Sequence, residues 1–405
     1  MVAPKLRFKG FNDDWEEALL TDIVHFYNGK GHEGVVDENG EYILINSKFI
    51  SSDRAVFKRV SECHQKVFDD SLVMVMSDVP NGKALAKFIH IVDGKEYALN
   101  QRIGMLVFKE EFSSKFYQYP LNRNKYYLAF DSGVGQTNLR KDEVLECPIY
   151  KLSLREQTKI ASFLSAVDEK ISQLTEKHAL LSQYKQGMMQ KLFSQQIRFK
   201  ADDGSEFGEW EELSLSKIFK LITDYVASGS FQSLRENVCP SDDGYAYYVR
   251  QVDLANGFKN ATKFVDKASY DFLSKSNLFV GDILFTNIGA SVGKVFILPE
   301  LNKPATVAPN LILLRVNDYN NNLFIYQFLN SEYAQNAIQK IVGGTGMPKI
   351  SKTDLKSLSF SLPSLEEQTK IANFLSAIDQ KIEVVAQQIE QAKQWKKGLL
   401  QQMFV

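Results

Sequence analysis

The chain has 405 residues, of which 44% are hydrophobic and 24% are charged, and its formal net charge is −1. This length suits two or three ordinary domains, and the composition is that of a globular protein with enough apolar surface for real cores. The near-neutral charge gives no support by itself to nucleic-acid binding. Because no long apolar run and no apolar leader occur, neither a membrane span nor a signal peptide is expected.

The cysteines indicate a compartment and argue against a metal centre. Cys63, Cys147 and Cys239 are widely separated and odd in number, which suits reduced thiols in a cytoplasm. Cys63 is followed by His64, but no second ligand pair stands at a metal-binding spacing. We therefore expect a cytoplasmic protein without a metal site.

The first 150 residues are predicted to form a domain of short strands separated by turns. Strands are expected at 42–45, 71–76 and 105–108, where β-branched and aromatic residues are frequent. Polar side chains follow the first of these strands, and a glycine-rich loop comes near the end of the domain. The candidate ligand-contacting residues in this half are Asn46, Ser47, Lys48, Gly133 and Gly135.

A long helix follows, and its sequence occurs twice. SLREQTKIASFLSAVDEKI at 153–171 returns as SLEEQTKIANFLSAIDQKI at 364–382, 211 positions later, with 15 of 19 positions identical. The period is too long for a solenoid, whose repeats have about 20–50 residues. In each copy a serine followed three residues later by a glutamate resembles a capping box, which predicts where the helix begins. The chain is therefore a duplicated half-protein: domain, helix, domain, helix.

Both helices carry an apolar seam with alternate spacings of four and three. This mean spacing of about 3.5 is typical of coiled coils, so the two helices are predicted to pack on each other. The alternative is that each amphipathic helix packs only on its own domain. Lys185 and Lys396 interrupt the seam, and polar residues there can specify register. The seam residues are Ile160, Leu164, Val167, Ile171, Leu174, Leu181, Ile371, Leu375, Ile378, Ile382, Val385 and Ile389.

The second domain opens like the first but has a different interior. Strands are expected at 247–252, 282–286 and 311–316, with a helix at 323–341. Arginine can pair bidentately with guanine, and asparagine or glutamine with adenine, so polar residues at strand ends are candidates for contacting bases. The alternative for each is a solvated loop or a structural turn. These candidates are Arg250, Gln251, Thr286, Asn287, Ser291, Lys294, Gly344, Thr345 and Gly346.

Catalytic motifs are absent. Residues 29–34 fit GxGxxG, but a turn and a strand follow where a dinucleotide site needs a helix. Residues 289–294 resemble part of a P-loop, but Ile288 stands where its first glycine is required. The chain contains no HExxH. We therefore predict that the chain has no catalytic residue.

Two divergent domains separated by repeated EQTKI-A-x-FLSA-[VI]-D-x-KI helices resemble the specificity subunit of type I restriction–modification systems. Gly281–Lys294 and the Trp-Glu pairs at 15–16 and 210–211 add to this resemblance, which covers the whole chain. It implies an α+β fold: two pseudo-repeated mixed α/β target recognition domains joined by two long helices forming an antiparallel coiled coil. The implied boundaries are 1–150 and 197–363 for the domains, and 151–196 and 364–405 for the spacer helices.

The resemblance also implies a function and partners. Each domain would recognise one half of a bipartite, asymmetric site in double-stranded DNA, and the helix pair would set the gap. Two modification subunits would methylate adenine, and restriction subunits would translocate and cut DNA. S-adenosylmethionine, ATP and Mg would then be bound by partner subunits, and this chain would hold no cofactor. A scaffold or decoy that does not recognise sequence and a stand-alone DNA methyltransferase remain as alternatives.

Overall fold

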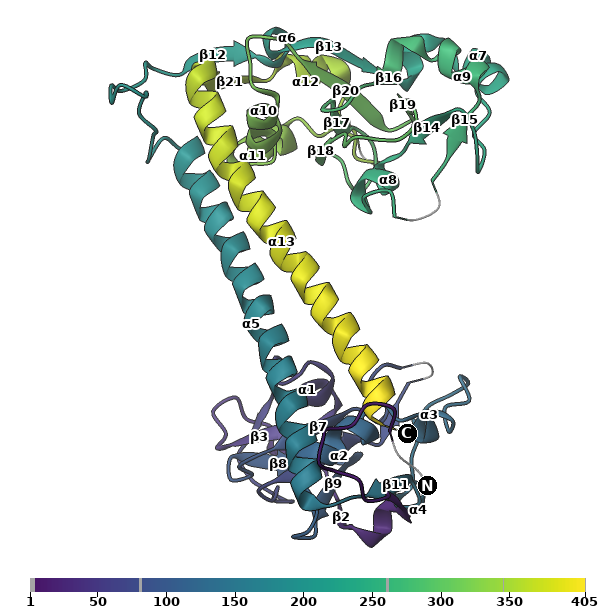
Figure 1. Ribbon diagram of the computed structural model, residues 1–405. Coiled ribbons are helices and arrows are strands. Elements are labelled where there is room, and N and C mark those ends of the chain that lie inside the picture. Colours follow the sequence, from purple (N-terminus) through teal and green to yellow (C-terminus); the bar gives the residue numbers. More distant parts are fainter. Residues whose placement is uncertain (1–3, 80–81, 260–261, 345, 405) are drawn as a thin grey trace. The chain divides into compact units, whose positions relative to one another are not determined.

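The computed structural model describes residues 4–79, 82–259, 262–344 and 346–404 (Figure 1). Its contacts divide the chain into two compact units, Met1–Thr175 with Gln387–Val405, and Glu176–Ala386. We call them unit 1 and unit 2. Each unit combines sheets and short helices with a segment of α5 (Leu154–Phe193) and a segment of α13 (Leu365–Met403), the two long helices. The predicted class, two pseudo-repeated α+β domains with two long helices, is confirmed.

Unit 1 is built around a four-stranded antiparallel sheet of order β2-β9-β5-β7 and a three-stranded sheet of order β4-β3-β8, in which β3 and β8 are parallel. Two short ribbons, β1-β11 and β6-β10, complete its strands. The strands are β1 (Glu16–Leu19), β2 (Val24–Asn28), β3 (Tyr42–Ile45), β4 (Arg59–Val60), β5 (Ser71–Val75), β6 (Ser77–Asp78), β7 (Phe88–Ile91), β8 (Tyr97–Leu99), β9 (Ile103–Phe108), β10 (Thr137–Asn138) and β11 (Pro148–Lys151). The short helices are α1 (Ser47–Ser51), α2 (Ser114–Leu121), α3 (Lys125–Leu128) and α4 (Lys141–Leu145).

The position of β5 inside the four-stranded sheet explains why the run Leu72–Val75 is continuously apolar. All five residues of β5 are buried. Because successive side chains of a strand point to opposite faces, Leu72 and Met74 enter the core shared with α2 and α5, while Val73 and Val75 enter a second core beneath α1. The sheet is thus covered on both faces, and helices α2 and α5 lie against one of them.

Unit 2 repeats this plan with sheets of order β13-β20-β17-β18 and β15-β14-β19-β16, and a ribbon β12-β21. The parallel pair β14-β19 corresponds to β3-β8. The strands are β12 (Glu211–Ser214), β13 (Phe219–Asp224), β14 (Ala246–Val249), β15 (Phe264–Val265), β16 (Asn277–Leu278), β17 (Ile283–Thr286), β18 (Val295–Ile297), β19 (Ala305–Val307), β20 (Leu311–Val316) and β21 (Ser359–Leu362). The short helices are α6 (Leu215–Ile218), α7 (Phe231–Asn237), α8 (Gln251–Ala255), α9 (Lys267–Phe272), α10 (Asn322–Leu329), α11 (Glu332–Lys340) and α12 (Lys352–Ser357).

Two predicted elements need correction. The strand expected at 247–252 ends at Val249, because Arg250 is the N-cap of α8. The helix expected at 323–341 is two helices, α10 and α11, because the Ser331 hydroxyl accepts a hydrogen bond from the backbone N–H of Ala334 and so caps a new helix. Strands 42–45 and 311–316 have the predicted bounds.

The long helices begin where the serine–glutamate pattern predicts. The Ser153 hydroxyl accepts from the backbone N–H of Glu156 at 3.3 Å. The Glu156 carboxylate, however, is paired with Arg7, whose Nε and Nη2 atoms lie 2.7 and 2.8 Å from its two oxygens. In unit 2 the Glu367 carboxylate receives Arg198 in the same way, at 3.0 and 2.7 Å. These two glutamates tie each helix start to the opening segment of its domain.

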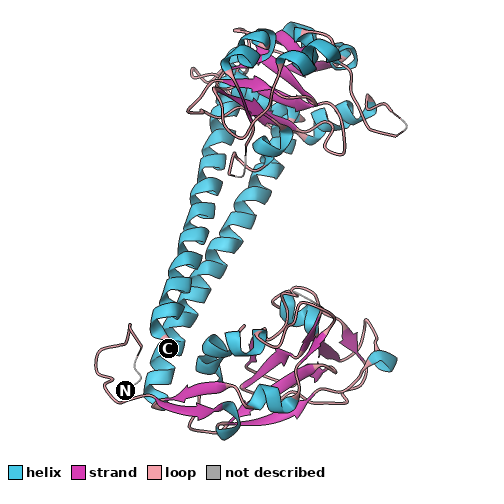
Figure 2. Cartoon of the chain, turned by 90° about the vertical axis from the view of Figure 1, so that its right-hand side faces the viewer, coloured by secondary structure: helices cyan, strands magenta, loops and turns pink. Residues whose placement is uncertain are grey.

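Within each unit, a segment of α5 lies beside a segment of α13 (Figures 1 and 2). In unit 1, Leu164 of α5 shares a core with Leu399 and Met403 of α13, and in unit 2, Leu192 of α5 shares a core with Leu375 of α13. Every predicted seam residue is buried or half-buried. Knobs-into-holes packing of the helices remains a prediction.

Candidate nucleic-acid interface

Polar residues of unit 2 gather around an open cleft with a volume of about 480 Å³. The cleft lies where β14 and β17 end, beside the turn that enters β20. Four of the residues that the sequence singles out line it: Arg250, Gln251, Thr286 and Ser291. The remaining lining residues are Tyr248, Val252, Ile288, Ala290, Ala308, Pro309 and Asn310. The structure therefore brings together side chains from three separate stretches of sequence.

Arg250 is held by a buried carboxylate. Its Nε and Nη2 atoms lie 2.9 and 2.7 Å from the two oxygens of Asp253, and its backbone N–H donates to Asp253 Oδ2 at 3.0 Å. The Asp253 side chain is 3% exposed, whereas that of Arg250 is 32% exposed. The hydrogen bond to Asp253 raises the pKa of Arg250. The guanidinium is thus fixed on its protein side while it lines the cleft.

Two buried polar atoms of this region have no hydrogen-bond partner in the part of the chain that the structure describes. Thr286 is 2% exposed, and neither its hydroxyl nor the side-chain oxygen of neighbouring Asn287 has a hydrogen-bond partner among the described residues. Buried polar atoms are usually satisfied, because leaving them unpaired costs about 1–3 kcal/mol. Thr286 lines the cleft, although its hydroxyl oxygen is itself buried. The cleft is also lined by Asn310, whose φ of 71° is left-handed.

The predicted glycine loop of unit 2 lies beside the same strand end. The backbone N–H of Gly289 donates to Pro348 O, and that of Ile350 donates to Asn287 O, both at 2.9 Å. Gly344 and Gly346 are exposed within this segment, whereas Thr345 lies outside the described residues. Lys294 is exposed but does not line the cleft. The loop and the cleft therefore belong to one end of the β17 strand.

In unit 1 the candidate residues Asn46, Ser47 and Lys48 follow the strand that corresponds to β14. Asn46 follows β3 as Arg250 follows β14, and its side-chain oxygen accepts from Phe49 N at 2.9 Å, so it caps α1. Ser47 is half-buried, and Lys48 is exposed. Gly133 and Gly135 have φ values of 71° and 78°, which glycine adopts without strain.

Several polar residues escaped the sequence analysis. Ser77 Oγ donates to Asn138 Oδ1 and accepts from Gln136 Nε2, each at 2.6 Å, beside the glycine loop of unit 1. Asp253 could have been found, because an acidic residue three positions after a helix N-cap, here Arg250, is typical of a capping pattern. Asn310 carries no such signal, since only the fold brings it to the cleft.

The lysines that interrupt the seam are paired with aspartates of the other helix. Lys185 Nζ lies 2.6 Å from Asp379 Oδ1, and Gln327 of α10 donates to Asp379 Oδ2 at 2.7 Å. In unit 1, Lys396 pairs with Asp168, which also accepts from the Tyr119 hydroxyl of α2 at 3.0 Å. Positions 168 and 379, like 185 and 396, are 211 apart. Each cluster therefore joins both long helices to one domain.

Some apolar side chains of the long helices remain exposed at repeated positions. Tyr184 and Trp395, 211 residues apart, are 52% and 54% exposed. Leu154 and Leu365, at the two helix starts, are 45% and 44% exposed. Large aromatic side chains that remain accessible are frequent at protein interfaces. The helices thus present the same apolar feature once in each unit.

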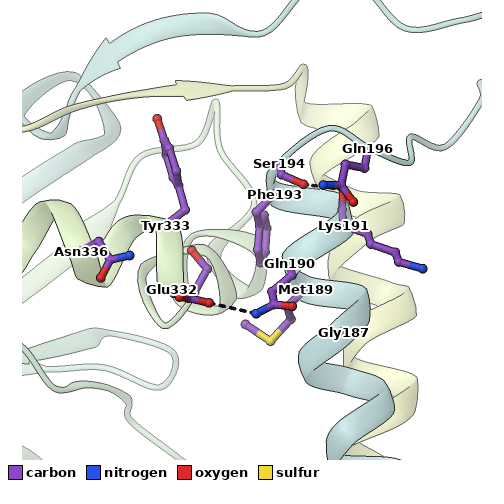
Figure 3. Close-up of a pocket in the computed structure, with 11 residues that line it drawn as sticks. Gly187, Met189, Gln190, Lys191, Phe193, Ser194, Gln196, Glu332, Tyr333 and Asn336 are labelled. Carbon is purple, nitrogen blue, oxygen red and sulfur yellow. Dashed lines mark hydrogen bonds between the residues drawn. The ribbon is translucent and has the colours of Figure 1, made fainter.

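A second cavity of unit 2 lies where α5 ends, beside α11, and has a volume of about 420 Å³ (Figure 3). Met189, Phe193 and Tyr333 supply apolar walls, and Gln190 Nε2 donates to Glu332 Oε2 at 2.9 Å. The equivalent place in unit 1, at Phe404, holds only about 60 Å³. The cavity of unit 2 is lined by one cationic side chain, Lys191, and this does not suit phosphate binding. We therefore assign no DNA contact to this cavity.

The described residues contain no group of three or more histidine, cysteine, aspartate or glutamate side chains that could hold a metal ion. Among the same residues, no helix is both long and apolar enough to cross a membrane.

Comparison with known proteins gives the same family for both halves. The family model described as the type I restriction modification DNA specificity domain matches residues 12–182 and 208–394. Two relatives from Methanocaldococcus jannaschii are the MjaVIII specificity subunit of a type I restriction enzyme, 25% identical, and a putative MjaX specificity subunit, 26% identical. The matches cover 96% of this chain in both cases, and 91% and 92% of the relatives.

Solved structures have the same fold. The S subunit of a type I restriction–modification system from M. genitalium superposes with a TM-score of 0.63 at 18% identity, covering 100% of this chain and 99% of that chain. A chain from a structure of type I system assembly and conformational transition gives a TM-score of 0.55 at 14% identity, covering 96% and 97%. The family model covers most of each half, so the chain belongs to the family of type I restriction modification DNA specificity domains.

Proposed function

We propose that this chain is the DNA-recognition subunit of a type I restriction–modification complex, in which each domain recognises one half of a bipartite, asymmetric site. The observation that carries the proposal is the cleft of unit 2, where Arg250, Gln251 and Thr286 come together from the ends of two strands in separate sheets. Arginine and glutamine are the side chains that pair with base edges in the major groove. Unit 1 presents Asn46 at the equivalent strand end.

The helix pair would set the gap between the two half-sites. A helix rises 1.5 Å per residue, so α5, with 40 residues, is about 60 Å long. Successive turns of B-DNA are about 34–36 Å apart. The two helices can therefore act as a ruler on the scale of one to two turns of DNA.

Two modification subunits are the proposed partners of the helices. The exposed aromatic residues Tyr184 and Trp395 occur once per unit at equivalent positions, which suits two copies of one partner. These subunits would methylate adenine with S-adenosylmethionine, and restriction subunits would use ATP and Mg to translocate and cut DNA. Partner subunits would also supply much of the phosphate contact, since this chain has a net charge of −1. The complex would work in the cytoplasm.

The two rival functions have weaker support. A stand-alone methyltransferase needs a cofactor site, and the sequence carries no motif for one. A scaffold that does not recognise DNA would need no cleft lined by polar side chains such as Arg250, Gln251 and Ser291. We therefore favour recognition, with catalysis in the partner chains.

Single-molecule sequencing of DNA methylation tests the proposal in cells that express this chain together with modification subunits. The expected result is adenine methylation at one two-part motif with a fixed gap. Cells that express the modification subunits alone are the control and should lack that motif. If the complex forms but methylates no defined motif, the chain is a scaffold and the proposal is wrong.

A further inference from the structure

The turn of residues 289–294, which joins β17 to β18, presents unused hydrogen-bond donors at the cleft of unit 2. The backbone N–H groups of residues 292–294 are all hydrogen-bonded within the turn or to the end of β17. Those of Ala290 and Ser291 have no hydrogen-bond partner among the described residues, and neither does the Ser291 hydroxyl. Both residues line the cleft. Successive free N–H groups in a turn form a concavity that suits an anion.

This turn has a counterpart in unit 1. There Ser77 lies opposite Asn138 in the β6-β10 ribbon, and in unit 2 Ile288 lies opposite Lys349. Because Asn138 and Lys349 are 211 residues apart, as the two copies of the long helix are, the two pairs correspond. The residue that follows Ser77 is Asp78, and its counterpart in unit 2 is a glycine.

In unit 1 this acidic side chain fills its own turn. Asp78 Oδ1 accepts a hydrogen bond from the backbone N–H of Val79 at 2.9 Å, and Oδ2 accepts from those of Ala84 and Leu85 at 2.7 and 3.1 Å. In unit 2 the corresponding Gly289 has no side chain, and no residue of 289–294 is acidic. An anion from outside the chain can therefore take the place that a carboxylate takes in unit 1.

Two lysines beside the turn have no ion pair in the part of the chain that the structure describes. Lys294 ends the turn and is exposed, as is Lys349. Because directly opposite residues of antiparallel segments share one face, Lys349 lies on the face of Ile288, which lines the cleft. Asp224, at the same end of the sheet, is already paired with Lys352 at 2.8 Å. The two lysines thus add positive charge beside the free N–H groups.

We propose that the turn of residues 289–294, together with Lys294 and Lys349, binds phosphates of the DNA backbone at the edge of the unit 2 cleft. The inference rests on the proposed function, since the phosphates belong to the DNA that unit 2 recognises. Lysine side chains, serine hydroxyls and backbone N–H groups are common donors to DNA phosphates. Such contacts position the duplex and carry no sequence information directly. Lys294 and Ser291 then contact the backbone, and the bases are recognised by other residues of the cleft.

The test measures equilibrium binding of the complete complex to a duplex with its motif and to one without it, over a range of salt concentrations. Lys294→Gln and Lys349→Gln should each lower the affinity for both duplexes by the same factor. Each should also reduce the slope of log affinity against log salt concentration by about 0.9, the value for one phosphate contact. The bases required for methylation should not change.

Lys220→Gln is the matched control. It removes the same charge from the opposite end of the sheet, where Lys220 is paired with Asp318 at 3.0 Å, and it should leave the salt slope unchanged. Duplexes with one uncharged methylphosphonate in place of a phosphate locate the contact. At one backbone position of the unit 2 half-site, this change should weaken binding by the wild-type complex more than binding by Lys294→Gln/Lys349→Gln.

The inference is overturned if both lysine variants keep the wild-type salt slope, as they would if the turn held only a free phosphate. It is also overturned if either variant changes a required base, or if no methylphosphonate distinguishes the double variant from the wild type. Failure of the proposed function is distinct, because then the wild-type complex binds both duplexes equally and methylates no two-part motif, whatever the salt slopes are.

Discussion

The ammonium group of Lys185 on α5 lies 2.6 Å from the carboxylate of Asp379 on α13. Lys185 occupies a position of the apolar seam, where an unpaired charge would be costly. Lys396 and Asp168 repeat the pairing with the roles of the helices exchanged. Because the residue number rises on one helix as it falls on the other, the two pairs fit one antiparallel register.

The first prediction concerns this register. Lys185→Asp should destabilise the protein, and adding Asp379→Lys should restore part of the loss. Since Asp379 is 41% exposed, the coupling free energy should be only about 0.5–1 kcal/mol. Urea unfolding of the four proteins of the cycle measures it. The exposed pair Lys393 and Glu390 on α13 is the matched control and should show no measurable coupling. A coupling of zero at both pairs would contradict the role of Lys185.

A second prediction concerns the buried ion pair at the start of α13. Arg198→Ala should cost about 3–5 kcal/mol of unfolding free energy, because it leaves the fully buried Glu367 carboxylate without its partner. Replacing both residues, as in Arg198→Met with Glu367→Leu, should recover most of this loss. Denaturant unfolding provides the measurement. Lys200→Ala, which removes an exposed pair with Glu206, is the control and should change stability by less than about 1 kcal/mol.

The exposed aromatic residues of the helices lead to a third prediction. Trp395→Ala and Tyr184→Ala should each weaken one of the two binding sites for a modification subunit, because accessible aromatic side chains supply much of the free energy of protein interfaces. Native mass spectrometry should then show complexes with one modification subunit in place of two. Gln183→Ala, an exposed substitution on the same helix, is the control. Full occupancy in the double variant Tyr184→Ala/Trp395→Ala would refute this docking surface.

The fourth prediction is a pH effect at His64. Its Nδ1 atom lies 2.8 Å from Gly31 O, and its Nε2 atom lies 3.3 Å from Glu62, and these bonds raise the pKa of His64 above 6.5. Lys30 acts against the shift, and the ring stacks on that of His32 at 4.7 Å. Because the pKa of His64 is higher in the folded protein than in the unfolded chain, protonation of His64 stabilises the fold. This contribution is fully present at a pH below the unfolded pKa, and it is lost as the pH rises through the folded pKa.

Proton NMR titration of His64 measures that pKa directly. Glu62→Gln should lower it, because the carboxylate stabilises the charged ring. Lys58→Gln, a neighbouring exposed change of charge on the same segment, should leave it within a few tenths of a unit. A His64 pKa below 6.5 in the wild type would contradict the hydrogen-bond arrangement.

Much of the fold could be predicted, because it is determined locally or by repetition. The duplicated helix sequence marks both long helices, and Ser153 marks a helix start. Strand 42–45 has strong β-propensity and turns on both sides. The division at Ser331 was missed because the apolar periodicity continues through it, and only the cap hydrogen bond shows that a second helix begins there.

The candidate site was harder to predict, because its parts meet only through tertiary structure. Arg250 and Thr286 were recognisable as polar residues at strand ends. Their closeness depends on how two separate sheets pack, because β14 belongs to one sheet and β17 to the other, and both strands end at one cleft. The partner of Lys185 could not be found from spacing alone, since Asp379 lies 194 residues away and belongs to the other helix.

The core that contains Leu164 also contains Leu399 and Met403, which are synthesised more than 200 residues later. On the ribosome, the first domain to emerge must therefore wait for α13 before its core is complete. At about 5–20 residues per second, the delay is on the order of ten seconds or more. During that time the apolar stripe of α5 is open to chaperones and proteases. The half of the protein that is translated first is thus the last to be finished.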